Sequence, residues 1–174
     1  MRERIAALTP DEKRLMGVMA SSGCIFDPIF EDARSVFIFN ATEEEPMTRP
    51  IIRAALMNGK EVYLPRIEGD VMVCVPYREG DALAMNEYGI SEPIAEALPF
   101  EKALALDLAI VPLVAFDKDK HRLGRGKGYY DRFLKRFSGV SLGYAFSVQE
   151  CDSVPIEPHD VTLDYIFTEE GCVL

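Results

Sequence analysis

Residues 124–128 read Gly-Arg-Gly-Lys-Gly and have the composition of an anion-binding loop. Glycines adopt the positive φ angles that turn successive backbone N–H groups toward one point, and they let the backbone come close to a ligand. Arginine and lysine add charge-assisted hydrogen bonds to phosphate oxygens. Asp131, three residues after the loop, can face a magnesium ion that bridges such phosphates. The segment therefore predicts a phosphate-binding site.

The loop matches neither of the two common glycine-rich phosphate motifs. The P-loop pattern G-x-x-x-x-G-K-[ST] is absent, and the third glycine comes one residue too early for G-x-G-x-x-G. A flexible glycine turn with solvated basic side chains therefore stays open as an alternative. The loop follows the most hydrophobic stretch of the chain, residues 106–116. This position favours a binding site, because open α/β sheets bind ligands at the carboxyl ends of their strands.

Basic residues are concentrated around this loop. Between Lys120 and Arg136 the chain has seven lysines and arginines against one acidic residue, a local charge of +6 in a chain whose net charge is -10. The rest of the chain then carries -16 and repels nucleic acid and anionic lipid. We expect a small anionic ligand, with no nucleic-acid partner and no membrane partner.

The length and composition are those of one globular domain, residues 1–174, which can bury roughly 70% of its unfolded surface. The four cysteines stand far apart without a C-x-x-C pair, which favours reduced thiols over a zinc knuckle or a disulfide scaffold. Neither a signal peptide nor a stretch of about 18 apolar residues is evident. We expect a cytoplasmic monomer.

Strand and helix signals alternate along the chain. Residues 35–40 and 61–65 are short apolar runs typical of strands, and residues 48–57 between them have four apolar side chains on one helical face. Strand, helix and strand in this order predict a βαβ unit with a parallel sheet. The predicted fold class is α/β, a three-layer α/β/α sandwich with a mostly parallel, Rossmann-like open sheet.

Further elements complete this sheet. Thr9-Pro10-Asp11-Glu12 has the pattern of a capping box and predicts a helix start. Strands are predicted at residues 71–77, 106–116, 140–146 and 165–168, and an amphipathic helix at residues 129–137. Residues 80–93 show no clear pattern and are treated as a long connection.

Residues 112–134, PLVAFDKDKHRLGRGKGYYDRFL, resemble the signature of the 5-formyltetrahydrofolate cyclo-ligases, also called methenyltetrahydrofolate synthetases. LGRGKGYYD matches without a gap, and weaker similarity extends over roughly residues 9–170. The resemblance implies closure of 5-formyltetrahydrofolate to 5,10-methenyltetrahydrofolate, with Mg²⁺ as cofactor and ATP as co-substrate, yielding ADP and phosphate. In such a reaction the formyl oxygen attacks the γ-phosphate, and N10 then displaces the phosphorylated oxygen.

The resemblance also implies which residues form the site. The implied ATP-binding residues are Arg122, Leu123, Gly124, Arg125, Gly126, Lys127, Gly128, Tyr129 and Tyr130. The implied substrate-binding residues are Asn40, Glu45, Arg125, Gly126, Lys127, Gly128 and Tyr129, and the implied magnesium ligands are Asp131 and Asp164. Arg125, Lys127 and Tyr129 are expected to be catalytic. Arg2 and Arg4 are the candidates for the phosphate-gripping side chains that the family carries on an N-terminal basic helix.

Two other functions stay open at this point. A non-catalytic or altered-specificity paralogue would bind a folate or a phosphorylated ligand without this turnover. An enzyme of another phosphoryl-transfer reaction is also compatible with the scaffold, because a fold does not fix a function. Glu45 itself ends an acidic run, residues 43–45, and such runs usually form a solvated surface.

Overall fold

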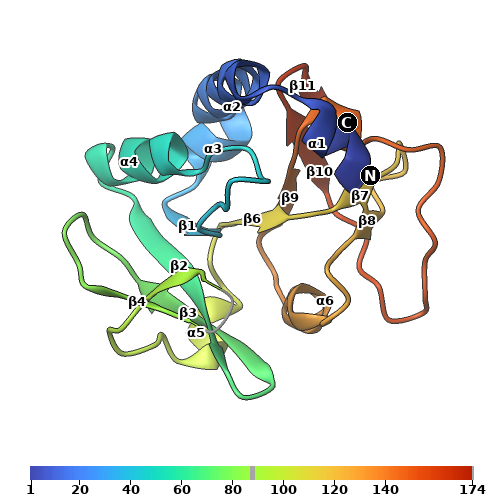
Figure 1. Ribbon diagram of the computed structural model, residues 1–174. Helices are drawn as coiled ribbons and strands as arrows, with labels where there is room; N and C mark the ends of the chain where they lie inside the picture. Colours follow the sequence, from blue (N-terminus) through green and yellow to red (C-terminus); the bar gives the residue numbers. More distant parts are fainter. Residues whose placement is uncertain (87–88, 174) are drawn as a thin grey trace.

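The computed structural model describes residues 1–86 and 89–173, except for the side chain of Arg2, and is built around one seven-stranded sheet (Figure 1). The sheet contains β1 (Ser35–Ile38), β2 (Glu61–Glu68), β3 (Val71–Pro76), β6 (Leu108–Pro112), β9 (Val140–Tyr144), β10 (Tyr165–Thr168) and β11 (Gly171–Val173). The strand order is β11-β10-β9-β6-β1-β2-β3. The five central strands run parallel, and the edge strands β3 and β11 run antiparallel to their neighbours.

Helices cover both faces of this sheet (Figure 1). One face packs against α2 (Pro10–Ile25), α3 (Pro28–Asp32) and α4 (Arg49–Met57), and the other against α5 (Phe100–Ala103) and α6 (Tyr129–Leu134). A short helix, α1 (Arg2–Ala7), contacts the 3-10 turn η1 (Ser147–Gln149). No helix of the described residues is long and apolar enough to cross a membrane. The predicted three-layer α/β/α sandwich with a mostly parallel sheet is confirmed.

Strand β1 lies at the centre of the core. Its four residues are all buried, with Val36 and Ile38 facing the layer of α2 and α4. Phe37 faces the other layer, where its ring lies 5.1 Å from the ring of Phe133 on α6. A strand covered on both faces needs apolar residues at consecutive positions, which is why this run lacks the polar alternation of a half-exposed strand.

Helix α2 begins at the predicted capping box. The Oγ1 of Thr9 accepts from the backbone N–H of Glu12, and the Glu12 carboxylate accepts from the backbone N–H of Thr9 at 2.8 Å. The side chains of Leu15 and Met19 are 61% and 50% exposed, so the large apolar residues face outward. The buried residues of the helix are small: Gly17, Ala20, Ser21 and Cys24. Small side chains let the helix axis approach the sheet closely.

The apolar run at residues 106–116 forms two strands rather than the one predicted. Strand β6 ends at Pro112, and the chain then turns into β7 (Ala115–Phe116), which pairs antiparallel with β8 (Arg122–Leu123). A proline has no N–H for a sheet ladder, so it favours the end of a central strand. The β7-β8 hairpin leads the chain toward the glycine-rich loop.

Three further segments also differ from the expectation. Residues 80–93 contain a small hairpin of β4 (Leu83–Met85) and β5 (Ser91–Pro93), whose connection includes residues 87–88 outside the described part of the chain. Helix α6 ends at Leu134, three residues before the predicted end. The edge strand β11 was not predicted, because its three residues show no pattern of their own.

The strand order reverses at β1. Strand β2 pairs with one side of β1 and β6 with the other, all in parallel. The chain segments that follow β1 and β6 therefore diverge at the carboxyl ends of these strands. A crevice forms between such segments, and open α/β sheets bind ligands there. The segment after β1 contains Asn40 and Glu45, and the segment after β6 leads to the glycine-rich loop.

Two aspartate–serine pairs tie the amino ends of the parallel strands together. The Oδ2 of Asp107, before β6, accepts from the backbone N and the Oγ of Ser35, both at 2.9 Å, and its own N–H donates to that Oγ at 2.9 Å. Asp164, before β10, makes the same three bonds with Ser141 at 2.8, 2.7 and 3.0 Å. Each pair, which we call a strand clamp, fixes the register of two neighbouring strands.

Asp107→Ala removes one strand clamp and leaves the N–H of Ser35 without this acceptor. The free energy of unfolding should fall by about 1–2 kcal/mol, as measured by urea denaturation at pH 7. Asp32→Ala is the matched control, because this exposed carboxylate makes no hydrogen bond within the described residues, and its effect should stay below about 0.5 kcal/mol. Equal losses in the two variants would contradict the role of the clamp.

Candidate functional site

The segment after β1 and the glycine-rich loop meet at Glu45 and Arg125. The Nη2 of Arg125 donates to the Oε1 of Glu45 at 3.0 Å. The Oε2 of Glu45 accepts from the backbone N and the Oγ1 of Thr42 at 2.8 and 2.9 Å. The Glu45 side chain is only 12% exposed. Glu45 is therefore a fixed acceptor, unlike the exposed Glu43 and Glu44 that precede it.

A cavity of about 530 Å³ opens beside this ion pair. Asn40, Thr42, Ser91 and Arg125 are among its lining residues. The Nδ2 of Asn40 donates to the backbone oxygen of Ser91 at 3.3 Å, so Asn40 connects the segment after β1 to the β4-β5 hairpin. Three of the predicted site residues, Asn40, Glu45 and Arg125, are thus brought together at one edge of the sheet.

The glycine-rich loop has the backbone conformation that its composition predicts. Gly126 and Gly128 have φ angles of +81° and +66°, in the left-handed region that favours glycine. Gly128 is also the residue from which α6 begins. The ammonium group of Lys127 is exposed and makes no hydrogen bond or ion pair with the described residues. The loop therefore presents an unused cation beside a strongly turned backbone.

Arg122 is a buried cation next to the loop. Its side chain is 3% exposed, its Nη2 donates to the Oδ1 of Asp131 at 2.7 Å, and its guanidinium lies 5.8 Å from the ring centre of Tyr130. Its Nε is buried without a hydrogen-bond partner in the described part of the chain. A buried charged group with an unused donor is costly. The site thus retains a donor that an anionic ligand can use.

The two tyrosines after the loop have different neighbours. The ring of Tyr130 lies 6.3 Å from the ring of Phe37 in β1, so Tyr130 packs on the core as its place on the apolar helical stripe predicts. Burial raises the pKa of Tyr130, and the nearby Glu45 carboxylate raises it further, so its hydroxyl stays protonated. The ring of Tyr129 instead carries the guanidinium of Arg132, 5.0 Å from its centre.

Asp131 and Asp164, the two predicted magnesium ligands, have different hydrogen-bond partners. The Oδ1 of Asp131 accepts from Arg122 and, at 3.4 Å, from the backbone N of Val161. Asp164 belongs to a strand clamp at the amino end of β9. The Asp164 carboxylate is thus engaged with Ser141 as a structural group, and its pairing with Asp131 at one metal ion stays a prediction.

A second cavity, of about 490 Å³, lies where Asp164 is found, at the amino ends of β6, β9 and β10. Asp107, Lys120 and Tyr165 also line it. No residue of the glycine-rich loop contributes to this cavity. It is thus separate from the site that contains Glu45 and Arg125.

Asp160 is next in sequence to the residue that contacts Asp131. It directly precedes Val161, whose N–H is bonded to Asp131. The Oδ2 of Asp160 accepts from the backbone N of Glu157 at 2.7 Å, and its Oδ1 lies 3.7 Å from the Nε2 of His159. Sequence reasoning missed Asp160 because it stands only four residues before Asp164. The available signal was its place in a proline-containing loop, where binding residues are more common than directly before a buried strand.

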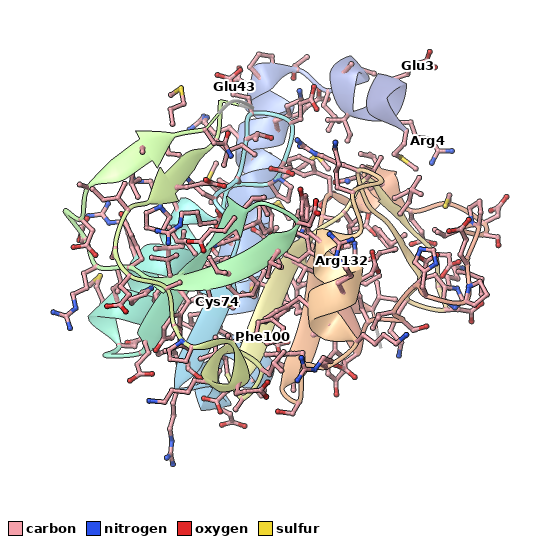
Figure 2. All side chains as sticks on the ribbon, turned by 90° about the horizontal axis from the view of Figure 1, so that it is seen from below. Glu3, Arg4, Glu43, Cys74, Phe100 and Arg132 are labelled. Carbon is pink, nitrogen blue, oxygen red and sulfur yellow. The ribbon has the colours of Figure 1, made fainter. Side chains whose placement is uncertain are left out.

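Arg4, one of the two N-terminal candidates, is engaged away from the glycine-rich loop. The Nη1 of Arg4 donates to the backbone oxygen of Glu150 at 2.8 Å, and Arg4 lies at the outer edge of the molecule (Figure 2). It makes no contact with the glycine-rich loop among the described hydrogen bonds and ion pairs. The side chain of Arg2, the other candidate, lies outside the described residues.

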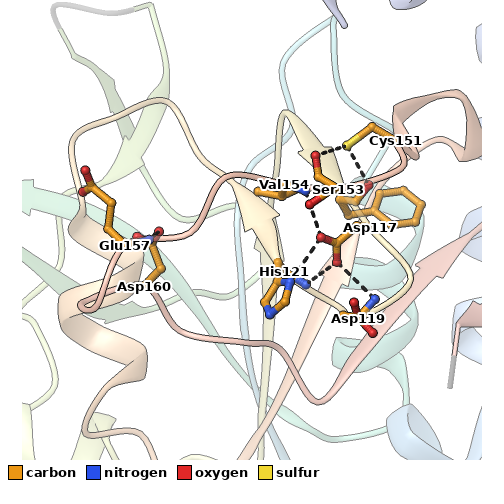
Figure 3. A network of polar contacts seen from close by, with 9 residues as sticks. Asp117, Asp119, His121, Cys151, Ser153, Val154, Glu157 and Asp160 are labelled. Carbon is orange, nitrogen blue, oxygen red and sulfur yellow. Dashed lines mark hydrogen bonds and ion pairs between the residues drawn. The ribbon is translucent and has the colours of Figure 1, made fainter.

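The segment that carries Asp160 is anchored by the buried Asp117 (Figure 3). The Oδ2 of Asp117 accepts from the backbone N of Val154 at 2.9 Å and faces the Nδ1 of His121 at 3.1 Å. Its Oδ1 accepts from the backbone N–H groups of Asp119 and His121 at 3.1 and 3.0 Å. Asp117, Asp119 and His121 lie within metal-binding distance of one another, but both oxygens of Asp117 are already used by these bonds.

Known proteins resemble this chain along almost its whole length. A profile of the 5-formyltetrahydrofolate cyclo-ligase family matches residues 1–169. The 5-formyltetrahydrofolate cyclo-ligase of Escherichia coli (strain K12) is 33% identical, over 97% of this chain and 96% of that protein. The protein of the same name from Mus musculus is 29% identical, over 98% of this chain and 91% of the mouse protein.

Two solved structures share the fold. The NMR structure of Aquifex aeolicus 5,10-methenyltetrahydrofolate synthetase superposes with a TM-score of 0.84 at 32% identity, covering 98% of this chain and 86% of that one. A 5,10-methenyltetrahydrofolate synthetase from Mycoplasma pneumoniae superposes with a TM-score of 0.75 at 23% identity, covering 96% and 92% of the two chains. The order of strands and helices described above is therefore an arrangement that solved structures also have.

Asp117→Ala should lower the free energy of unfolding by about 2–4 kcal/mol, because four hydrogen bonds lose their buried acceptor. Burial would raise the pKa of Asp117, but the bonds from Val154 and His121 outweigh this effect and hold the pKa below its ordinary value of 3.8. The stabilisation is thus complete above about pH 4 and is lost as the pH falls through the lower folded pKa.

Urea unfolding of the wild type and of Asp117→Ala between pH 7 and pH 2 measures this effect. The difference in stability between the two proteins should shrink below about pH 4. Asp119→Ala serves as the control, since its exposed carboxylate accepts none of these bonds, and should give a small difference throughout. A difference between wild type and Asp117→Ala that does not change with pH would refute the assignment.

Proposed function

The chain belongs to the 5-formyltetrahydrofolate cyclo-ligase family and is a ligase, and we propose that it converts 5-formyltetrahydrofolate to 5,10-methenyltetrahydrofolate with ATP and Mg²⁺. The formyl oxygen takes the γ-phosphoryl group of ATP and ADP is released. N10 then attacks the formyl carbon, which bears the phosphorylated oxygen. This attack forms the C–N bond and expels phosphate. Phosphoryl transfer of this kind needs mainly the positioning of two substrates and the stabilisation of charge.

The observation that carries the proposal is the ion pair of Arg125 and Glu45. Reacting atoms must approach to within about 3–3.5 Å, so the element that holds phosphate and the element that holds the folate ring have to be neighbours. The 3.0 Å contact between these side chains shows that the glycine-rich loop and the segment after β1 lie side by side. Neither segment is close to the other in sequence.

The cations of the glycine-rich loop suit the phosphate groups of ATP. Arg122 has a buried Nε without a protein partner, and Lys127 has a free, exposed ammonium group. Arg125 of the glycine-rich loop pairs with Glu45 of the segment after β1, so its guanidinium can contact the transferred group. Positive charge held in place before the reaction stabilises the charge that develops on the transferred phosphoryl. The turned backbone at Gly126 and Gly128 supplies N–H donors to the same oxygens.

The cavity beside the loop suits the folate ring. Its volume of about 530 Å³ lies within the range of small-molecule sites. A carboxylate has about four lone-pair sites, of which the described bonds to Glu45 use three. Glu45 can therefore accept a further hydrogen bond from a ring N–H of the substrate, and Asn40 lines the same cavity.

The donor set near Asp131 fits a magnesium ion. The Oδ2 of Asp131 accepts no hydrogen bond from the described residues, and Asp160 is tied to its neighbourhood through Val161. Carboxylate oxygens together with substrate phosphates are the ligands that Mg²⁺ prefers. We propose that Asp131 and Asp160 hold the ion, which when bound would neutralise charge on the transferred phosphoryl group.

The experiment that tests the function follows ADP release and methenyltetrahydrofolate absorbance after mixing the protein with 5-formyltetrahydrofolate, ATP and Mg²⁺. Both signals should rise together in equal amounts, and neither should rise without the metal. Folate binding without either signal would identify a non-catalytic binder. ADP release without the methenyl product would identify another phosphoryl-transfer enzyme.

Lys127→Ala should lower kcat about 100-fold or more, because one preorganised charge on the transferred phosphoryl group is lost. Its thermal midpoint should not change, since the side chain is exposed and makes no contact. Lys135→Ala is the matched control, with an exposed lysine of the same basic segment that also makes no described contact. Comparable losses of kcat in both variants would count against a specific role for Lys127.

Asp160→Asn and Asp164→Asn separate the metal site from the strand clamp. Asp160→Asn should raise the Mg²⁺ concentration for half-maximal turnover about tenfold or more. Asp164→Asn should lower the thermal midpoint through its clamp with Ser141 and leave the Mg²⁺ dependence unchanged. The opposite pattern would return the ligand role to Asp164.

A further inference from the structure

Arg132, on α6, touches three parts of the structure around the glycine-rich loop. Its Nη1 donates to the backbone oxygen of Lys127 at 3.1 Å, and its Nη2 donates to the backbone oxygen of Asp70 at 3.0 Å. Its guanidinium also lies over the ring of Tyr129, 5.0 Å from the centre. Asp70 belongs to the turn between β2 and β3, which approaches the labelled Arg132 beside α6 (Figure 2). One side chain thus links the loop to a separate hairpin of the sheet.

The guanidinium also packs closely on the end of the loop. A Cβ added to Gly128 would lie 2.9 Å from the Nη1 of Arg132, closer than real Cβ contacts. Gly128 has only a hydrogen atom where other residues have a Cβ atom, so the guanidinium fits into this space. Gly128 is needed here for its positive φ angle and also for this contact.

The hydrogen bond from Arg132 to the Lys127 oxygen also orients the N–H group of Gly128. The peptide between Lys127 and Gly128 is planar and trans, so its C=O and N–H groups point in opposite directions. A guanidinium that holds the Lys127 oxygen therefore also fixes the direction of the Gly128 N–H. That N–H is one of the loop donors available to a phosphate.

We propose that Arg132 is a positioning residue that holds the glycine-rich loop in its anion-binding conformation by joining it to the β2-β3 turn. The catalytic consequence rests on the proposed function, whereas the ordering of the loop does not. Two backbone oxygens on separate segments are held by the two Nη atoms of one rigid, planar group. A lysine at this position would keep the charge but would lack the fixed fork of donors.

Arg136 provides a matched control four residues further along. Its guanidinium lies 5.0 Å from the ring centre of Phe100, and its Nη2 donates to Glu101 at 3.0 Å. It therefore makes the same kinds of contact, a ring contact and a hydrogen bond. None of its described partners belongs to the glycine-rich loop.

Limited trypsin digestion without any ligand tests the ordering of the loop, because trypsin cleaves after Arg125 and Lys127. Arg132→Ala should be cleaved there about tenfold faster than the wild type, as expected when a charge-assisted hydrogen bond is lost. Arg132→Lys should also be cleaved faster, and Arg136→Ala at the wild-type rate. An unchanged rate in Arg132→Ala would overturn the proposal, whatever the enzyme does. So would a wild-type rate in Arg132→Lys, since charge alone would then suffice.

Steady-state kinetics tests the consequence for the reaction. Arg132→Ala and Arg132→Lys should raise the KM for ATP about tenfold, with less than a twofold change in the KM for 5-formyltetrahydrofolate, and Arg136→Ala should change neither. An unaltered KM for ATP despite faster cleavage of the loop would overturn the positioning role. Absence of turnover in the wild type would refute the proposed function and leave the digestion result standing.

Both tests compare variants whose thermal midpoints match that of Arg136→Ala. Should Arg132→Ala not fold, Arg132→Met takes its place, because a methionine keeps an apolar contact on the Tyr129 ring without donating hydrogen bonds. Faster cleavage of this variant supports the proposal, and a wild-type rate overturns it.

Discussion

The reversal of strand order at β1 determines where the rest of the site can lie. Because β2 and β6 pair in parallel with opposite sides of β1, the segments that follow β1 and β6 leave the same edge of the sheet and diverge. The ion pair of Glu45 and Arg125 joins them again at one point, and a cavity of about 530 Å³ lies beside it. A ligase needs two substrates side by side, and this topology provides two neighbouring loops that differ in charge.

The strand clamps and the candidate site lie at opposite ends of the parallel strands. Asp107 and Asp164 clamp the amino ends to serine residues and so fix the register of the strands. Arg125 and Glu45 meet beyond the carboxyl ends, where Arg122 retains an unused buried donor. Unpaired charge near the site lowers the free energy of unfolding, and the core and the strand clamps offset this loss.

Local sequence patterns predicted individual strands, helices and the glycine-rich loop. An apolar run predicted the strand at residues 35–40, and helical spacing predicted the helix at residues 48–57. The succession of glycines predicted the loop. Each of these signals lies in a short stretch of neighbouring residues. The β7-β8 hairpin was not found, because β7 continues the apolar run of β6 and β8 has only two residues. The capping box predicted the start of α2 but not its buried face, which carries small residues and not Leu15 and Met19.

Both substrates are proposed to bind between the segment after β1 and the glycine-rich loop. An NMR titration of isotope-labelled protein with 5-formyltetrahydrofolate, and then with a non-hydrolysable ATP analogue and Mg²⁺, tests this proposal. Amide shift changes are expected at residues 40–45 for the folate and at residues 122–130 for the nucleotide. Changes confined to the other cavity, lined by Asp107, Lys120 and Asp164 at the amino ends of the strands, would contradict it.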